Sequence, residues 1–406
     1  MLRATPADIA FDPLELMAEQ ALLGALLLDA TAVAAIASWL HPAHLYRPVH
    51  QQLLQVLVDR DRAGHRATEP DASAEDRRDW ALGAIDQASA SATGFTVNYG
   101  HTLIAACPAP ASANTYAALV LQSAVRRELM VHTHRLGTAA AAGNLADVWL
   151  LLRALERTAA RCSTAWSQAT AWHAPLPGPG GPATTTEPAA QTADTALAAE
   201  QQLIAVLMEH PHSANDLRPP VRAEDFASPL HRLMFSAIAD LSQRSLGVDP
   251  LTVMWQVRAT APSDPAPDLD QVRQLASQAG AGDPAYWADQ VITASVLRTV
   301  RAGAEQLHQL AMDPRRSLET VFAEAYRIMP QLHSACARAP TPLPQAPAGP
   351  AATGSRAKAA VGDRTRSALP RSVSSTASNT DVTLPGVRPA PEAGSTVRTT
   401  PAPIRP

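Results

Sequence analysis

Apolar residues recur along most of this chain at intervals of three and four positions, which is the spacing of one face of an α-helix. Asp12, Pro13 and Glu15 mark a helix start, because Asp is a good N-cap and Pro suits the first helical position. The same reasoning predicts helices in the first half of the chain at residues 13–29, 31–40, 48–59, 75–89, 97–106, 115–142 and 145–171. Only Gly143 and Asn144 separate the last two, so we expect them to form an antiparallel hairpin.

The second half of the chain repeats this plan. It predicts helices at residues 194–209, 229–244, 251–258, 269–278, 284–312 and 314–329. Residues 175–194 are rich in Pro, Gly and Thr, and residues 337–406 are rich in Pro, Ala, Ser and Thr. Neither composition can bury an apolar face, so we interpret them as a linker and a disordered tail.

The expected fold is therefore all-α, with two tandem domains that each consist of a helical head followed by a helical hairpin. We place a disordered lead at residues 1–11, the first domain at 12–174, the linker at 175–194, the second domain at 195–336 and the tail at 337–406.

The two domains look like copies of one unit. Glu19 and Glu200 are 181 positions apart, and so are His50 and His231, in similar local sequences. One spacing kept over two distant landmarks indicates an internal duplication. Later the spacing is 171, for the pairs Tyr116 and Trp287, Val120 and Val291, and Arg127 and Arg298. The segments between these two sets of landmarks therefore differ in length between the copies, as loops often do in proteins that share a fold.

Composition supports helices and narrows the chemistry. Apolar residues make up 46% of the 406 residues and aromatic residues only 4%, so the core must consist of Ala, Leu and Val, of which Ala and Leu are good helix formers. The only lysine is Lys358, which Ala359 follows. A phosphate-binding P-loop needs a lysine followed by Ser or Thr, so the sequence argues against an ATPase site of that kind.

Charge and cysteine content say less about function. The net charge of −4 indicates no general attraction to nucleic acid. Residues 337–406 nevertheless hold eight arginines and one lysine against three acidic residues, a net charge of +6. Three widely spaced cysteines, Cys107, Cys162 and Cys336, indicate reduced thiols and a cytoplasmic protein. We find neither a signal peptide nor an apolar stretch of membrane-spanning length, so we expect no membrane association.

The repeated signature resembles a known family. Its elements are Ala-Glu-Gln at the start of each copy, a Pro-x-His element ending at His50 or His231, and the aromatic, Val and Arg of the long helix. Copy 2 is the fuller version, with Phe226 where copy 1 has Leu45. This order resembles the N-terminal domain of the bacterial replicative DNA helicase, the DnaB family, over roughly residues 12–170 and 195–330.

The resemblance implies a helical head followed by a hairpin. In that family the hairpins pair between subunits, and the resulting collar docks primase and loader proteins. The RecA-like motor of the family, with its P-loop, is missing from this sequence, so we expect no helicase or ATPase activity, no enzyme activity and no cofactor.

We therefore expect a non-catalytic protein-interaction protein of DNA replication. Its partners by resemblance are the replicative helicase, primase or helicase loader, and it would self-associate through its hairpins. A linker of ~20 residues spans ~25 Å on average, so the two hairpins can pair within one molecule. The alternative is a DNA-associated regulator that binds nonspecifically through the Arg-bearing tail. A hidden enzyme is a third hypothesis, for which the sequence nominates no site.

Nine residues carry the family signature, and we expect structural or interface roles for them rather than catalysis, cofactor binding or metal binding. They are Glu19, His50, Tyr116, Arg127, Glu200, Phe226, His231, Trp287 and Arg298. A catalytic His needs an orienting carboxylate or a nucleophile, and we identify none that matches in both copies. The helix dipole suffices to explain a glutamate near the start of each copy's first helix.

Other candidates have two interpretations each. The pairs His41 and His44, and His132 and His134, could suggest zinc, but structural zinc needs four ligands and neither pair recurs in copy 2. For Arg127 and Arg298 we favour a solvated helix face over a pairing with a carboxylate. Three tryptophans lie on or just after the return helix of the first hairpin, and we favour core packing over an interface role for Trp149, Trp166 and Trp172.

Overall fold

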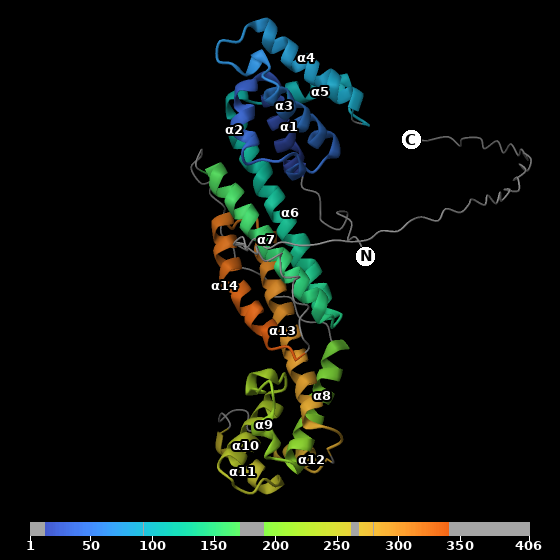
Figure 1. The fold of residues 1–406 in the computed structure, drawn as a ribbon, viewed down its shortest axis with the longest axis vertical. Coiled ribbons are helices and arrows are strands. Elements are labelled where there is room, and N and C mark those ends of the chain that lie inside the picture. The colour runs from blue at the N-terminus through green and yellow to red at the C-terminus, as the bar shows by residue number, and fades with distance from the viewer. Residues whose placement is uncertain (1–12, 92, 171–190, 261–267, 279, 341–406) are drawn as a thin grey trace, which may run out of the picture. The chain divides into compact units, whose positions relative to one another are not determined.

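The computed structural model describes residues 13–91, 93–170, 191–260, 268–278 and 280–340. By its internal contacts the chain divides into two units, Met1–Pro347 and Ala348–Pro406, and every described residue lies in the first. Within these described ranges the chain forms helices and no strand (Figure 1). The all-α prediction is confirmed. The predicted lead, most of the linker, and the tail beyond residue 340 lie outside the described residues.

Head 1 surrounds its first helix. It comprises α1 (Pro13–Leu28), α2 (Val33–Ala37), α3 (Pro48–Arg62), α4 (Ala74–Ser91) and α5 (Val97–Ala106). Leu22, Leu23 and Leu26 of α1 are fully buried, because α3, α4, α5 and the start of α6 pack around this helix. The indole N–H of Trp80 donates a hydrogen bond of 2.9 Å to the carbonyl of Leu26 and ties α4 to α1.

Hairpin 1 follows as α6 (Ala113–Ala141) and α7 (Leu145–Thr170). Its turn depends on Gly143, which has a φ of +75° that side chains disfavour. The amides of Gly143 and Asn144 donate to carbonyls of the last turn of α6 at 3.2 and 3.1 Å. The predicted hairpin connection is thus present, but it contains Ala142 in addition to Gly143 and Asn144.

Copy 2 repeats these elements in the same order. Head 2 comprises α8 (Gln191–Glu209), α9 (Ser213–Asp216), α10 (Pro229–Gln243), α11 (Pro250–Thr260) and α12 (Leu269–Ala276). Hairpin 2 comprises α13 (Pro284–Met312) and α14 (Leu318–Ala337). Both ends of α10 lie 181 positions after those of α3, and both ends of α13 lie 171 positions after those of α6. The insertion that changes the spacing therefore falls between these helices, where α4 and α5 of head 1 are longer than α11 and α12 of head 2.

The last helix differs from its prediction at both ends. It begins at Leu318 rather than Pro314, because Ser317 is the N-cap and its Oγ accepts a hydrogen bond from the amide of Thr320 at 3.3 Å. It also continues through Pro330 to Ala337, well beyond the expected end at residue 329. Leu332 and Cys336 are buried, so packing against the other hairpin helices maintains the helix past the proline.

The hydrophobic core does not follow the two copies. One cluster of buried side chains runs from head 1 through hairpin 1 into hairpin 2, and a second cluster belongs to head 2. Leu129 and Leu136 of α6 share the first cluster with Val300 and Leu307 of α13. Helices α6, α7, α13 and α14 thus form one four-helix bundle within a single chain (Figure 1). The predicted pairing of the hairpins within one molecule is present in the structure.

No single described helix is long and apolar enough to span a membrane. Two helix pairs, bent by 110° and 85° at their breaks, have the necessary length and composition only when each pair is taken together. Their apolar residues include Leu26 and Leu121, which are buried in the core.

Candidate functional site

A buried glutamate–histidine pair occurs once in each head. Nδ1 of His50 lies 2.6 Å from Oε2 of Glu19, and Nδ1 of His231 lies 2.8 Å from Oε2 of Glu200. The two partners are 31 positions apart in both copies, and all four side chains are almost fully buried. The expectation that no carboxylate matches in both copies was therefore wrong, and the two glutamates show the same spacing of 181 as the two histidines.

The same glutamates also hold the loop that precedes the next helix. Glu19 accepts a hydrogen bond from the amide of Tyr46, and Glu200 accepts one from the equivalent amide of Ala227 at 2.6 Å. Both glutamates lie beyond the first turn of their helices, where the dipole effect fades, so the dipole explanation was also wrong. Each glutamate instead joins the first helix of its head to the start of α3 or α10.

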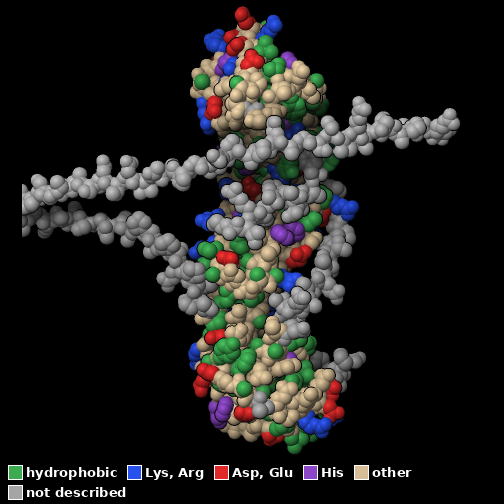
Figure 2. Space-filling view, turned by 90° about the vertical axis from the view of Figure 1, so that its right-hand side faces the viewer, with side chains coloured by type: hydrophobic (Ala, Val, Ile, Leu, Met, Phe, Trp, Pro, Cys, Tyr) green, Lys and Arg blue, Asp and Glu red, His purple; other side chains and the backbone are tan. Residues whose placement is uncertain are grey.

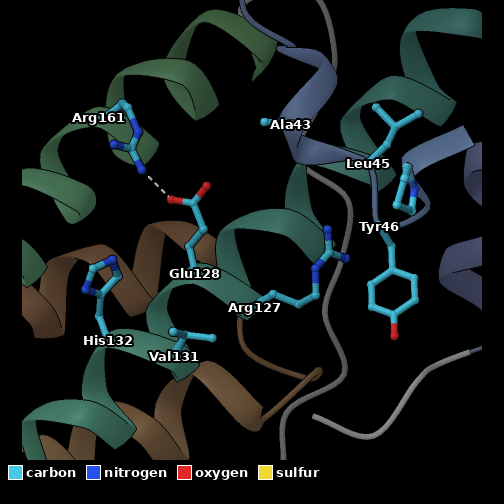
Figure 3. Close-up of a pocket in the computed structure, with 9 residues that line it drawn as sticks. Ala43, Leu45, Tyr46, Arg127, Glu128, Val131, His132 and Arg161 are labelled. Carbon is cyan, nitrogen blue, oxygen red and sulfur yellow. Dashed lines mark hydrogen bonds and ion pairs between the residues drawn. The ribbon is translucent and has the colours of Figure 1, made fainter. Parts of the chain in front are cut away.

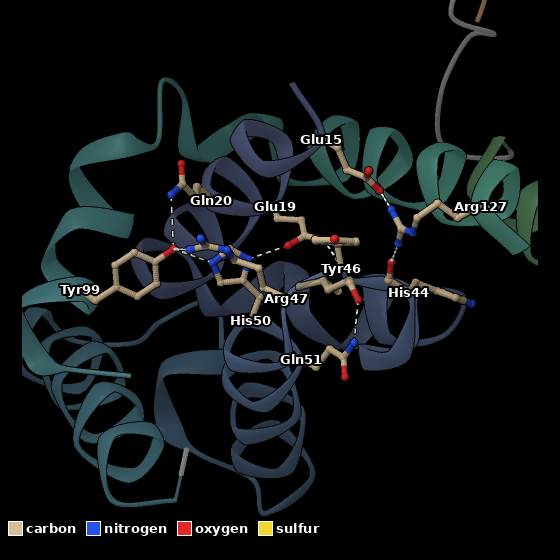
Figure 4. A network of polar contacts seen from close by, with 11 residues as sticks. Glu15, Glu19, Gln20, His44, Tyr46, Arg47, His50, Gln51, Tyr99 and Arg127 are labelled. Carbon is tan, nitrogen blue, oxygen red and sulfur yellow. Dashed lines mark hydrogen bonds and ion pairs between the residues drawn. The ribbon is translucent and has the colours of Figure 1, made fainter. Parts of the chain in front are cut away.

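In head 1 the pair extends into a larger network (Figure 4). Nε2 of His50 lies 2.7 Å from the hydroxyl of Tyr99, which also accepts hydrogen bonds from Gln20 at 3.3 Å and from Arg47 at 3.4 Å. A glutamate, a histidine and a hydroxyl in series resemble the order of a catalytic triad. Glu19 and His50 have no exposed surface, however, and the hydrogen bonds of the network link α1, α3 and α5.

The two signature arginines join each head to its long helix. Arg127 donates to the carbonyl of His44 at 2.7 Å, and Arg298 donates to the carbonyl of Asp225, at the equivalent position, at 3.0 Å. Arg127 also forms an ion pair with Glu15 (Figure 4). Burial lowers the pKa of Arg127 to about 10, although Glu128 opposes this shift, and burial likewise lowers the pKa of Arg298. For Arg127 the favoured interpretation of a solvated helix face was therefore wrong, whereas the Arg298 side chain is exposed and still keeps its hydrogen bond to the head.

The histidines that could suggest zinc have other roles. The backbone amide of His41 donates to Nδ1 of His44 at 3.0 Å, and the two residues form a capping box at a short 3₁₀ helix. In copy 2 the backbone amide of Arg222 donates in the same way to the carboxylate of Asp225 at 2.8 Å, so the position recurs although the residue type changes. Nε2 of His132 lies 3.2 Å from the hydroxyl of Thr158. No group of three or more potential metal ligands occurs in the part of the chain that the structure describes.

Asp225 is a site residue that the sequence did not single out. Its buried carboxylate accepts two hydrogen bonds from Arg338, at 2.7 and 2.6 Å, and one from Ser295 at 3.0 Å. These bonds raise the pKa of Arg338 and attach the end of α14 to head 2. The equivalent residue in copy 1 is His44. The sequence suggested His44 only as a possible zinc ligand and not as the repeat equivalent of Asp225.

The aromatic signature residues are packing residues. Phe226 is fully buried with its ring centroid 4.9 Å from that of Phe235, and Leu45 is buried at the equivalent place. Tyr116 and Trp287 are partly buried against the two clusters, and the indole of Trp287 donates to the carbonyl of Ala281 at 2.6 Å.

The three tryptophans of the first return helix divide as follows. Trp166 is buried, and the ring of Trp149 lies edge-on to that of His333, with centroids 5.4 Å apart. Trp172 lies outside the described residues. Cys107, Cys162 and Cys336 are free thiols, and burial raises the pKa of Cys162 to about 12 and that of Cys336 to about 11.

A pocket of about 580 Å³ lies where head 1 meets hairpin 1 (Figure 3). Its lining residues are Ala43, Leu45, Tyr46, Pro48, Arg127, Glu128, Val131, His132 and Arg161. Each arginine of the lining is paired, Arg127 with Glu15 and Arg161 with Glu128. Burial lowers the pKa of His132, which favours its neutral form. The pocket therefore presents neither an unpaired arginine nor an arranged nucleophile.

Comparison with known proteins agrees with this duplicated architecture. The chain is 34% identical over 118 residues to the replicative DNA helicase DnaB of Mycobacterium leprae (strain TN). That match covers 29% of this chain and 18% of the helicase, so the chain matches only a small part of that relative's length. No solved structure matches the chain. The family model described as the DnaB-like helicase N terminal domain matches residues 12–122 and again residues 192–292, and the chain thus belongs to this family with two copies of the domain.

Proposed function

We propose that this chain is a non-catalytic interaction protein of DNA replication. One observation carries the proposal: the chain holds two helicase N-terminal domains whose hairpins already pair with each other in one bundle. The buried glutamate–histidine pairs of both heads, and the hairpin arginines that bind head carbonyls, support a scaffold role, because their polar atoms are used to hold each copy together. The partner classes that fit are the replicative helicase, primase and the helicase loader.

Head 2 has a surface that suits protein binding. Leu251 and Trp255 of α11 are 67% and 74% exposed. They are four positions apart and therefore neighbours on one face of the helix. Large apolar side chains in such positions are enriched in protein interfaces, and tryptophan is frequent among their energetically dominant residues.

A capture experiment tests the proposal. Immobilised full-length chain is offered the purified helicase, primase and loader of the same host one at a time, and we expect stable capture of one of them. Trp255→Ser should reduce this capture if head 2 makes the contact. Tyr326→Ser is the matched control, because Tyr326 is a 45% exposed aromatic residue of the hairpin helix α14. Failure to capture any of the three proteins would contradict the proposal, and ATP hydrolysis by the purified chain would contradict its non-catalytic part.

The DNA-binding alternative predicts different behaviour. Figure 2 shows acidic and basic side chains interspersed over the visible face of the described helices, so this alternative depends on the tail. Nonspecific binding through arginines should weaken steeply as salt rises. Duplex DNA that binds the full chain in low salt but not a chain without residues 341–406 would favour the alternative.

A further inference from the structure

The two hairpins meet in the arrangement of a two-fold symmetric dimer. Thr133 of α6 lies against His308 of α13, with 3.1 Å between Oγ1 and Nδ1, and Gly137 lies next to Ala304. As the numbers rise along α6 they fall along α13, so the helices are antiparallel. Under the repeat spacing of 171, Thr133 corresponds to Ala304 and Gly137 to His308. The two contacts therefore exchange places, as contacts do in an isologous interface between identical subunits.

The polar contacts across this interface break that symmetry. Arg126 of α6 is buried and donates to the carbonyls of Ala311 at 3.0 Å, of Asp313 at 2.8 Å and of Arg316. The last carbonyls of a helix lack partners within it, and the five donors of a guanidinium can satisfy several of them. The residue of α13 that corresponds to Arg126 is Leu297, which has no hydrogen-bonding group.

The loops that receive these side chains also differ. Residues 313–317 separate α13 from α14, whereas only residues 142–144 separate α6 from α7. Two of the carbonyls that accept from Arg126 belong to this longer loop, so the shorter loop cannot present the same set. The cation and its acceptors are thus divided between the copies.

The return helices show a second unsymmetrical contact. The indole N–H of Trp166 on α7 donates to Glu319 of α14 at 2.6 Å. Aligning α7 and α14 at their first residues superimposes the buried residues Val148, Leu152 and Leu155 on Val321, Ala325 and Ile328. In that alignment Trp166 corresponds to Ala339 and Glu319 corresponds to Ala146, so neither partner is duplicated.

We infer that the two hairpins are complementary halves, and that Arg126 determines which hairpin binds which. Two copies of hairpin 1 would bury two arginines without the carbonyls of the longer loop. Two copies of hairpin 2 would leave those carbonyls facing leucines. Because buried polar groups without partners are costly, hairpin 1 selects hairpin 2, and neither hairpin selects itself. This inference depends on the packing of the bundle and not on the proposed function.

One consequence concerns where other proteins bind. The hairpin face is occupied by the sister hairpin of the same chain, so a further copy of the chain has no matching face there. Contacts with other proteins would have to use the heads or the outer faces of the bundle.

The first test uses a disulfide in the full chain. A Cβ atom on Gly137 would lie 3.8 Å from that of Ala304, within the usual range for a disulfide. Oxidised Gly137→Cys/Ala304→Cys protein should contain an intrachain crosslink and stay at the mass of one chain, 42.8 kDa. The two single variants are the controls for the native cysteines. Disulfide-linked dimers, or absence of any crosslink, would overturn the intrachain pairing.

The second test measures the role of Arg126. A protease site placed within residues 175–190 of the full chain allows the linker to be cut after folding, and the affinity of the two halves is then measured. Arg126→Leu, which installs the residue of copy 2, should weaken the association by about tenfold or more, as expected for a buried charged hydrogen bond.

Arg127→Leu is the matched control. Arg127 is the neighbour of Arg126 in the sequence, but it contacts head 1 and not the other hairpin. The control should keep the affinity within about threefold, which is less than one typical hydrogen bond. Trp166→Phe, which removes the indole donor and keeps an aromatic ring, should also weaken the association. Equal affinities for Arg126→Leu and the unchanged chain, or equal losses for Arg126→Leu and Arg127→Leu, would overturn the inference.

Discussion

The two copies of the domain keep some contacts in common and differ in others. Both keep a glutamate that binds a histidine and a loop amide, and both keep an arginine that binds the carbonyl before that loop. They differ at the position of His44 and Asp225, where copy 1 has a neutral cap and copy 2 has a carboxylate bound to Arg338. The shared contacts hold each head together and join it to its own long helix. The contact that differs attaches the end of α14 to head 2 and has no counterpart in copy 1.

The largest expected effect comes from breaking a shared contact. Glu19→Gln replaces a carboxylate that binds both His50 and the amide of Tyr46, so it should lower the free energy of unfolding by about 3 kcal/mol. Glu200→Gln should cost a similar amount, since its contacts are equivalent. Chemical denaturation of both variants measures this. A large loss in only one copy would show that the pair is structural in that copy alone.

The next effect should differ between the copies. Arg127→Met leaves the buried Glu15 without its ion-pair partner and should cost about 2–3 kcal/mol. Arg298→Met removes a hydrogen bond to a carbonyl, and the position matching Glu15 in copy 2 is Ala196, so we expect a loss of about 1–2 kcal/mol. Unfolding free energies of the two variants should therefore rank in this order, and the reverse order would contradict the assigned contacts.

Asp225→Asn affects copy 2 alone. The carboxylate accepts two charge-assisted hydrogen bonds from Arg338, so its loss should cost about 1.5–3 kcal/mol. It should also increase hydrogen exchange in the last turn of α14, which Arg338 attaches to head 2. His44→Asn, at the equivalent position of copy 1, is the control and should leave that turn unchanged.

A smaller effect should appear when Tyr99 is changed to phenylalanine. The substitution removes the hydroxyl that contacts His50 while keeping the ring, so head 1 should lose about 1 kcal/mol. Denaturation of this variant, compared with Glu19→Gln, separates the extension of the network from its shared part. A loss as large as that of Glu19→Gln would mean that the tyrosine and not the carboxylate dominates.

The smallest effect concerns pH. Burial lowers the pKa of His44 from its ordinary value of 6.5 and also lowers that of His132. The folded chain then binds fewer protons than the unfolded chain below about pH 6.5, so stability should fall as the pH falls through this range. Neither histidine recurs in copy 2, where Asp225 and Gly303 stand. Denaturation at pH 7.5 and 5.5 should therefore show a smaller decrease for His44→Asn than for the unchanged chain.

Much of the helical plan could be predicted from the sequence, and part of the site could not. The spacings of 181 and 171 can be read directly from the sequence. The structure keeps the first at both ends of α3 and α10, and the second at both ends of α6 and α13. The partner of each histidine was missed because the two residues are distant in sequence and each one has a local explanation. The start of the last helix was placed at residue 314 rather than after the cap Ser317, because Asp313 and Pro314 offer a stronger local signal. Its end was placed at residue 329, whereas buried neighbours maintain the helix through Pro330.

The sequence by itself determined that the chain is helical, that one unit occurs twice, and that the unit resembles a helicase N-terminal domain. These properties depend on local spacing and on residue type, which are present before folding. Only the tertiary structure decided that the glutamates bind the histidines, that Arg126 reaches the loop after α13, and that one core joins both hairpins. Such contacts join residues far apart in the chain, and their energy depends on burial, which no single segment possesses alone.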